Sequence, residues 1–263
     1  MFCLFFIFAC NEGSLKDQSI NSVNNQPHNN PPLEWENPSN PYDSCGEYHN
    51  QGLGYFISNR DSIHCDDSLL FVNDIISYST DFTCSLGLYQ GEGNCTDDYQ
   101  SIATQNFNIR YNYSIDELII SGAVSNDSKL EMQNLVSMIR QVTDSNQLST
   151  LYSSIKVWES NIINSQYSNA TKKQLLGTSS VIRFSLHYWN SERIKGENTL
   201  WLLPCESEMM LYKKNRLQGI GEWFSDAVDW VCDNWEGVVA TAVADGSGFY
   251  YGGGFADNDP NNN

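Results

Sequence analysis

Three successive stretches in the second half of the chain, residues 127–142, 147–164 and 169–189, show the apolar periodicity of amphipathic α-helices. Their stripes contain Leu135, Met138, Ile139 and Val142 in the first, Leu148, Leu151, Tyr152, Ile155, Glu159 and Ile162 in the second, and Leu175, Ser179, Ile182, Leu186 and Trp189 in the third. Short polar breaks separate the stretches, so consecutive helices are expected to pack antiparallel. The sequence therefore predicts a mainly α fold, an antiparallel helical bundle-like domain.

Further helices are predicted on either side of this group. In the first, Asp43 is the expected N-cap. The apolar face of this helix is formed by residues that recur every three or four positions: Tyr42, Cys45, His49, Leu53 and Phe56. Another helix is expected over residues 67–78, and a long last helix over residues 215–244. Ser114 and Glu117 have the spacing of a capping box. Residues 107–113 alternate as a strand does and could form a short β-hairpin.

The first ten residues form an apolar run that ends at Cys10, after which the chain is polar. A bilayer-spanning helix needs about 20 apolar residues, so this run is too short to span and has the length of a signal-peptide core. The run resembles the processing site of bacterial lipoproteins, which Ile7 and Ala9 fit and from which Phe8 departs. We therefore expect residues 1–9 to be a signal peptide and Cys10 to carry an acyl lipid such as palmitate. The alternatives are a plain signal peptide cut elsewhere and an ordinary cytosolic N-terminus.

Composition divides the remaining chain. Residues 10–40 are rich in Asn and Pro with few aliphatic side chains, so a disordered linker behind the lipidated cysteine is predicted. A coil of that length reaches roughly 30 Å. Residues 41–254 are expected to be the mainly helical domain, and residues 255–263 a flexible tail.

The net charge is −18, from 14 basic and 32 acidic residues. Such a charge disfavours nucleic acid, because affinity for phosphate backbones comes largely from Lys and Arg. It also disfavours direct attraction to anionic lipid headgroups. The expected partners are a membrane, reached through the lipid on Cys10, and an unknown protein or glycan. No nucleic-acid partner is expected.

The cysteines predict disulfide bonds. Of the eight, Cys3 lies in the leader and Cys10 would carry the lipid, which leaves six: Cys45, Cys65, Cys84, Cys95, Cys205 and Cys232. An even number in an exported protein suggests disulfides, although six cysteines allow fifteen connectivities. Cys84 and Cys95 flank a glycine-rich turn and make a plausible local pair. The alternative is that several are buried free thiols.

A family resemblance follows from short motifs. The run Asn40-Pro41-Tyr42-Asp43, followed by Gly46 and His49-Asn50, resembles the start of the folded part in a group of uncharacterised exported bacterial lipoproteins. The pair Tyr188-Trp189 and the glycine- and alanine-rich residues 237–254 are similar to features of the same group. The resemblance covers most of residues 40–254, and it implies neither a substrate nor a catalytic residue.

Two histidines are the candidates for a ligand or general base. His49 lies on the apolar stripe of the first helix, and His187 follows Arg183 by one turn. A hydrogen-bonded core histidine is the ordinary interpretation, and a catalytic or metal-binding role is the alternative. The sequence contains no H-E-x-x-H, G-x-S-x-G, P-loop or dinucleotide fingerprint. No catalytic residue, metal or cofactor is therefore assigned.

The predicted last helix carries two further patterns. Five carboxylates lie opposite its apolar side, as a solvated face or as a surface for a cation or basic partner: Glu222, Asp226, Asp229, Asp233 and Glu236. A straight helix spreads such carboxylates along its length, which argues against a tight calcium site. Beyond them, small residues recur every four positions, at Ala240, Ala244, Gly248 and Gly252. This spacing is either a frayed, flexible end or a glycine-zipper contact with a partner or a second copy.

The functional prediction is a lipid-anchored exported envelope protein with a binding or structural role and no evident catalytic activity. We expect it on a bacterial membrane, at the outer membrane or cell surface. The alternatives are an exported hydrolase with a His/carboxylate site and an antagonistic factor that acts through residues 237–254.

Overall fold

The computed structural model describes residues 31–59, 62–63, 68–87, 94–101, 104, 115–121, 123, 125–195, 239, 242–243 and 245–246. The regular secondary structure in this part of the chain is helical, and these residues include no strand, which confirms the predicted mainly α fold. The predicted strand at residues 107–113 lies outside the described residues.

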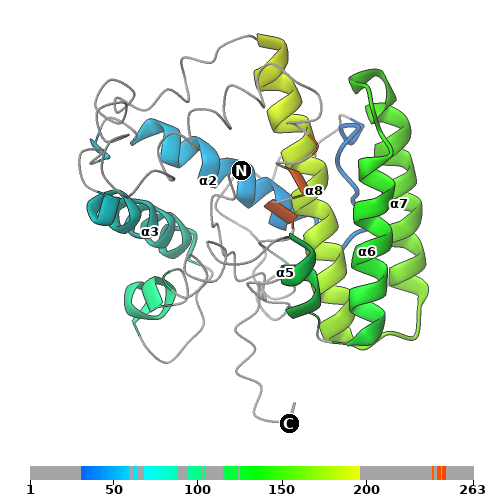
Figure 1. Cartoon of the computed structure of the whole chain (residues 1–263), viewed down its shortest axis with the longest axis horizontal. Coiled ribbons are helices and arrows are strands. Elements are labelled where there is room, and N and C mark those ends of the chain that lie inside the picture. The colour runs from blue at the N-terminus through cyan, green and yellow to red at the C-terminus, as the bar shows by residue number, and fades with distance from the viewer. Residues whose placement is uncertain are drawn as a thin grey trace.

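Helices α6 (Asn126–Arg140), α7 (Leu148–Asn164) and α8 (Asn169–Lys195) form the bundle that the periodicity predicts. They run antiparallel in chain order and lie side by side (Figure 1). A 3₁₀ turn, η2 (Ser145–Gln147), joins α6 to α7. Helix α8 continues six residues past its predicted end at Trp189. The stripe residues of α7 and α8 are all buried, polar Glu159 and Ser179 among them.

Side-chain caps fix where these helices begin. The Ser125 hydroxyl accepts a hydrogen bond from Ser128 N at 3.0 Å, before α6. The Asp144 carboxylate accepts one from Asn146 N at 2.9 Å, before η2. Short polar side chains at such positions satisfy backbone N–H groups that have no partner within the helix. The polar breaks in the sequence are therefore the helix starts.

Helix α2 (Ser44–Ser58) contacts both α8 and α3 (Ser68–Ser85), and α5 (Ile115–Ser121) contacts α6 (Figure 1). The predicted α2 face is buried, and α3 runs seven residues beyond its predicted end at residue 78. At Gly46, an added Cβ would lie 2.4 Å from Phe184 Cδ2 and 2.6 Å from Ser180 O. The missing side chain therefore lets α2 approach the backbone of α8.

Asp43 occupies the predicted N-cap position of α2, but its side chain makes no capping hydrogen bond. Its carboxylate instead accepts a hydrogen bond from Asn37 N at 2.8 Å and pairs with Arg183. A tertiary ion pair has replaced the local interaction that the sequence predicts.

A disulfide joins Cys84 at the end of α3 to Cys95, with the two Cα atoms 5.9 Å apart. This is the local pair that the sequence predicts, and Cys45 is disulfide-bonded as well. Gly87, just after α3, has a φ of +67°, which a glycine adopts at little cost as the chain leaves the helix.

The folded body extends further toward the N-terminus than the boundary predicted at residue 40. Residues 33–43 form successive turns, closed by hydrogen bonds such as Asn40 N to Asn37 O at 2.8 Å. Asn37 and Asn40 are buried, although both lie in the stretch predicted to be a linker.

Several predicted features lie outside the described residues: the leader 1–9 with Cys10, the carboxylates Glu222, Asp226, Asp229, Asp233 and Glu236, the small residues Ala240, Ala244, Gly248 and Gly252, Ser114, and the tail 255–263. Of the predicted last helix, Val239, Ala242 and Val243 are described, and they are helical and buried. None of the helices in the described part of the chain is long and apolar enough to cross a membrane.

Candidate functional site

Two clusters of mostly buried polar side chains lie on different sides of helix α8. The first, which we call the Glu159 network, consists of Asn37, Asn40, Asp43, Glu159, Ser179 and Arg183. The second, the Asp245 cluster, consists of His49, Ser185, Trp189 and Asp245. Successive residues of an α-helix are rotated by about 100°, so Arg183 and Ser185 point in very different directions.

Glu159 is the centre of the first group, and its side chain is completely buried. Its Oε1 accepts hydrogen bonds from Arg183 Nη2 at 3.0 Å and Nε at 3.2 Å, and from the Ser179 hydroxyl at 2.5 Å. A buried carboxylate is tolerated when it is paired and its lone pairs are hydrogen-bonded. The helix periodicity that places Ser179 and Arg183 one turn apart on α8 supplies both donors.

Two asparagine amides complete the coordination of Glu159. Asn37 Nδ2 donates to Oε2 at 2.6 Å, and Asn40 Nδ2 donates to Oε1 at 2.9 Å and to Leu176 O at 3.0 Å. These bonds join the N-terminal segment to α7 and α8. Residues 33–43 are therefore fastened across the bundle by hydrogen bonds to a buried charge.

Arg183 is completely buried and binds three segments at once. Besides Glu159, its Nη2 donates to Asp43 Oδ1, and its Nη1 donates to the backbone carbonyl of Trp35. The planar guanidinium presents several donors in a fixed geometry, which suits this role. One side chain thus ties α8 to α7, to the start of α2 and to the N-terminal segment.

His187 belongs to the Arg183 side of α8. Its ring stacks on Trp35, with centroids 3.3 Å apart and planes 11° apart. It is half-buried, and its stacking partner lies in the same segment that Arg183 holds. The interpretation of His187 as a packing residue explains these contacts without a catalytic role.

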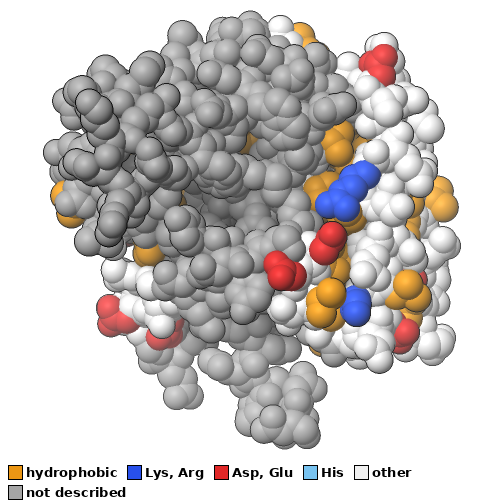
Figure 2. All heavy atoms as spheres, in the orientation of Figure 1, with side chains coloured by type: hydrophobic (Ala, Val, Ile, Leu, Met, Phe, Trp, Pro, Cys, Tyr) orange, Lys and Arg blue, Asp and Glu red, His pale blue; other side chains and the backbone are white. Residues whose placement is uncertain are grey.

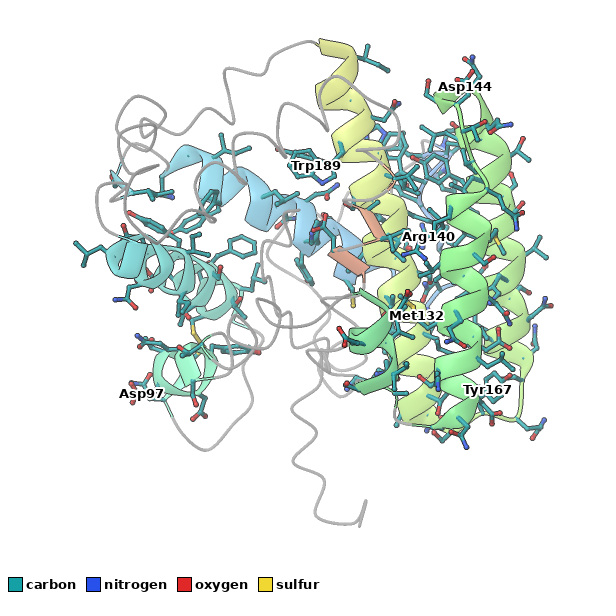
Figure 3. All side chains as sticks on the ribbon, viewed as in Figure 1. Asp97, Met132, Arg140, Asp144, Tyr167 and Trp189 are labelled. Carbon is teal, nitrogen blue, oxygen red and sulfur yellow. A yellow bond between two sulfur atoms is a disulfide. The ribbon has the colours of Figure 1, made fainter. Side chains whose placement is uncertain are left out.

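The Asp245 cluster lies where α2 meets α8. Asp245 Oδ2 accepts hydrogen bonds from the Ser185 hydroxyl at 2.6 Å and from Trp189 Nε1 at 3.2 Å. His49 Nε2 lies 3.6 Å from the same oxygen, and all four side chains are buried. Figure 3 shows Trp189 on the side of α8 that faces α2.

The order of contacts in this cluster differs from that of a Ser–His–acid triad. In a triad, the histidine lies between the serine and the acid and takes the serine proton. Here Asp245 lies between Ser185 and His49, and the Ser185 hydroxyl donates to the carboxylate. The cluster contains the residue types of a hydrolase site. Their order and burial are instead those of a structural hydrogen-bond cluster between helices.

The structure places the two candidate histidines on different sides of α8. His49 meets the side that carries Ser185 and Trp189, while His187 lies two residues from each of them and so about 160° around the helix. This geometry does not bring the two histidines together in one site. A carboxylate, that of Asp245, lies beside His49.

The motif residues on which the family resemblance rests lie at the junction of α2 with the bundle. Asn40 and Asp43 belong to the Glu159 network, and Gly46 N donates to the Ser180 hydroxyl at 3.0 Å. Asn50 Nδ2 donates to Phe184 O at 3.0 Å. Together with His49 in the Asp245 cluster, these contacts give the motif a structural role: it docks α2 onto α8.

Charged side chains and possible metal ligands elsewhere in the described residues form no comparable cluster. Among the residues that the structure describes, no group of three or more His, Cys, Asp or Glu could hold a metal ion. Over the face of α6 and α7 in Figure 2, acidic and basic side chains lie singly among uncharged ones. This face of the bundle therefore shows no patch of one sign.

No sequence pattern assigned a role to Arg183, Asn37 or Asp245, and Asn40 entered only as part of the resemblance motif. A usable signal did exist for Glu159 and Ser179, since each is a polar residue on an otherwise apolar stripe. Such a position predicts a buried polar partner. No local pattern marks Asn37, whose partner Glu159 is 122 residues away.

In comparisons with known proteins, no family model matches this chain, and no curated protein and no solved structure matches it at a significant level. Its function is therefore inferred from its own residues and their contacts.

Proposed function

We propose that this chain is an exported protein, anchored to a bacterial membrane through a lipid on Cys10, with a binding or structural role at the cell envelope. The observation that carries the proposal is the Cys84–Cys95 disulfide. Disulfides persist in oxidising compartments outside the cytoplasm and are rare within it. The apolar leader that ends at Cys10 and the resemblance to exported lipoproteins favour the same compartment.

The contacts of the buried polar residues favour a non-catalytic role. Arg183 donates hydrogen bonds to a backbone carbonyl and to Glu159, while Glu159 and Asp245 accept hydrogen bonds from side chains of other segments. A catalytic group has to be within reach of a substrate, whereas these groups are buried by the chain's own elements. Their contacts join segments that are distant in sequence, which is what a stable binding scaffold requires.

The anchor is tested by the mass and location of the mature protein. We expect loss of residues 1–9 and addition of acyl mass at Cys10, with the protein in the membrane fraction. The variant Cys10→Ser should lack the acyl mass and leave the membrane fraction. Cys3→Ser is the matched control, because it removes a leader thiol and should leave the mature protein unchanged. A mature protein without acyl mass would contradict the anchor.

The compartment is tested by the thiols. In protein taken from its native source without reductant, an alkylating reagent under denaturing conditions should leave Cys84 and Cys95 unlabelled. Full labelling of both cysteines would overturn export to an oxidising compartment. This readout is independent of the lipid, so the two parts of the proposal can fail separately.

The partner is a protein or glycan that the chain meets at the envelope. Because residues 33–40 are part of the folded body, the bait for capture should begin at residue 31. A bait that begins at residue 41 lacks the amides that bind Glu159 and serves as the comparison. Loss of a captured partner from the shorter bait alone would place its binding surface on or near the N-terminal segment.

A further inference from the structure

Five described residues near the C-terminus are packed into the body of the molecule. Val239, Ala242, Val243, Asp245 and Gly246, which we call the docked segment, are helical and buried. Val239, Ala242, Val243 and Gly246 follow the i, i+3, i+4, i+7 spacing of one helix face. This face contains small and β-branched residues and a single carboxylate at its edge.

Gly246 marks a close approach between the docked segment and α8. An added Cβ would lie 2.2 Å from Ile182 Cγ1 and 2.6 Å from Ile182 Cδ1. A real Cβ has no room at such a distance, so the absence of a side chain is what lets this backbone contact α8. The contact surface is therefore α8 of the same chain.

Asp245 supplies the polar part of the same contact. Its Oδ2 accepts hydrogen bonds from Ser185 and Trp189 of α8 and lies 3.6 Å from His49 Nε2 of α2. If the docked segment left, the Ser185 and Trp189 donors of α8 would lose this acceptor. A segment that covered Ser185 and Trp189 without supplying an acceptor would leave buried donors unsatisfied, at a cost of about 1–3 kcal/mol, so the carboxylate makes docking specific.

We propose that Asp245 is an intramolecular latch, which holds the docked segment on α2 and α8 and withholds it from other molecules. Any partner that recognises the glycine- and alanine-rich residues 237–254 has to compete with α8 for the face that carries Ala242 and Gly246. Release needs the loss of the Asp245 contacts, while the α6–α8 bundle keeps its own packing. The inference does not depend on the lipid at Cys10.

Hydrogen–deuterium exchange of the intact mature chain tests the latch. Asp245→Asn keeps the side-chain shape but removes the charge that pairs with the donors. We expect exchange in peptides that cover residues 239–246 to rise at least about tenfold, with α6 and α7 unchanged. Gly246→Ala should release the same peptides by steric conflict with Ile182.

Two matched controls separate the latch from general effects. Asp97→Asn removes a carboxylate from an exposed position, and Gly54→Ala adds a Cβ where no atom lies within 4 Å. Neither control should change exchange near residue 245. If Asp245→Asn does not fold, Ser185→Ala, which removes one donor, replaces it. Unchanged exchange at residues 239–246 in the latch variants, or an equal rise in α7, would overturn the proposal.

Discussion

Arg183 Nη2 lies 3.0 Å from Glu159 Oε1, and both side chains are completely buried. Two charges in the interior lose their hydration, and their attraction compensates only when the remaining donors and acceptors are also satisfied. In this chain the asparagine amides, the Ser179 hydroxyl, the Trp35 carbonyl and the Asp43 carboxylate supply those partners. The pair therefore determines where the N-terminal segment and α2 meet the bundle.

Removing one member of this pair should be strongly destabilising. Arg183→Met leaves Glu159 buried without its cation, and we expect the free energy of unfolding to fall by about 3–5 kcal/mol in urea denaturation. Arg140→Met is the control, since Arg140 pairs with Asp116 at 3.8 Å and both side chains are at least half exposed. Its effect should stay below about 1 kcal/mol. Equal losses in the two variants would show that the buried ion pair stabilises the fold no more than the exposed pair does.

The N-terminal segment should contribute to stability through its amides. Asn40→Ala removes a donor to Glu159 and to Leu176 O, and we expect a loss of about 1–3 kcal/mol. Asn146→Ala, whose exposed amide donates to Asp144 at 3.2 Å, should change stability by less than about 0.5 kcal/mol. Thermal unfolding of both variants checks the difference. A neutral Asn40→Ala would restore the linker interpretation of residues 33–40.

The close approach of α2 to α8 makes Gly46 sensitive to substitution. The added Cβ of Gly46→Ala would conflict with Phe184 and with the Ser180 carbonyl, and backbone atoms cannot rotate away. We expect a loss of about 1–3 kcal/mol. Gly54→Ala on the same helix meets no atom within 4 Å and should stabilise by up to about 1 kcal/mol through helix propensity. Denaturant midpoints of the two variants should therefore move in opposite directions.

The buried Tyr152 phenol should make the folded chain less stable at alkaline pH. Burial, and secondarily Glu34, raise the pKa of the Tyr152 phenol above its ordinary value of 10.0. The unfolded chain ionises this group near that pH while the folded chain keeps it neutral. Stability is therefore complete below pH 10 and falls as the pH rises further, by up to about 1.4 kcal/mol per pH unit.

The substitution Tyr152→Phe should remove this part of the alkaline loss. At neutral pH it should cost little, because the hydroxyl has no hydrogen-bond partner among the described residues. Tyr167→Phe is the comparison, since the Tyr167 hydroxyl donates to Glu131 Oε1 at 2.9 Å and its loss should reduce stability at neutral pH by about 1 kcal/mol. Urea unfolding at pH 7 and pH 11 gives both numbers. An unchanged alkaline slope in Tyr152→Phe would contradict the pKa shift.

The bundle was predictable because its helices carry regular apolar stripes, and the ends of α6 and α7 agree with the expected ones within two residues. The Cys84–Cys95 pair was predictable because the two cysteines flank a short turn. The site was harder, because its interactions join residues far apart in sequence. Asn37 and Asn40 have the composition of a disordered linker, yet Glu159 lies 122 and 119 residues beyond them. Only the folded arrangement of α7 and α8 places the Glu159 carboxylate where these amides can bind it.

The attachment of residues 33–43 to Arg183 has a mechanical consequence. If Cys10 is held in a membrane, tension along the tether reaches the body through the Trp35 carbonyl and the Asn37 and Asn40 amides. Those contacts lie along the middle of α7 and α8 rather than at a helix end. Force would therefore act on several hydrogen bonds at once, and the helices would resist it together instead of unravelling turn by turn.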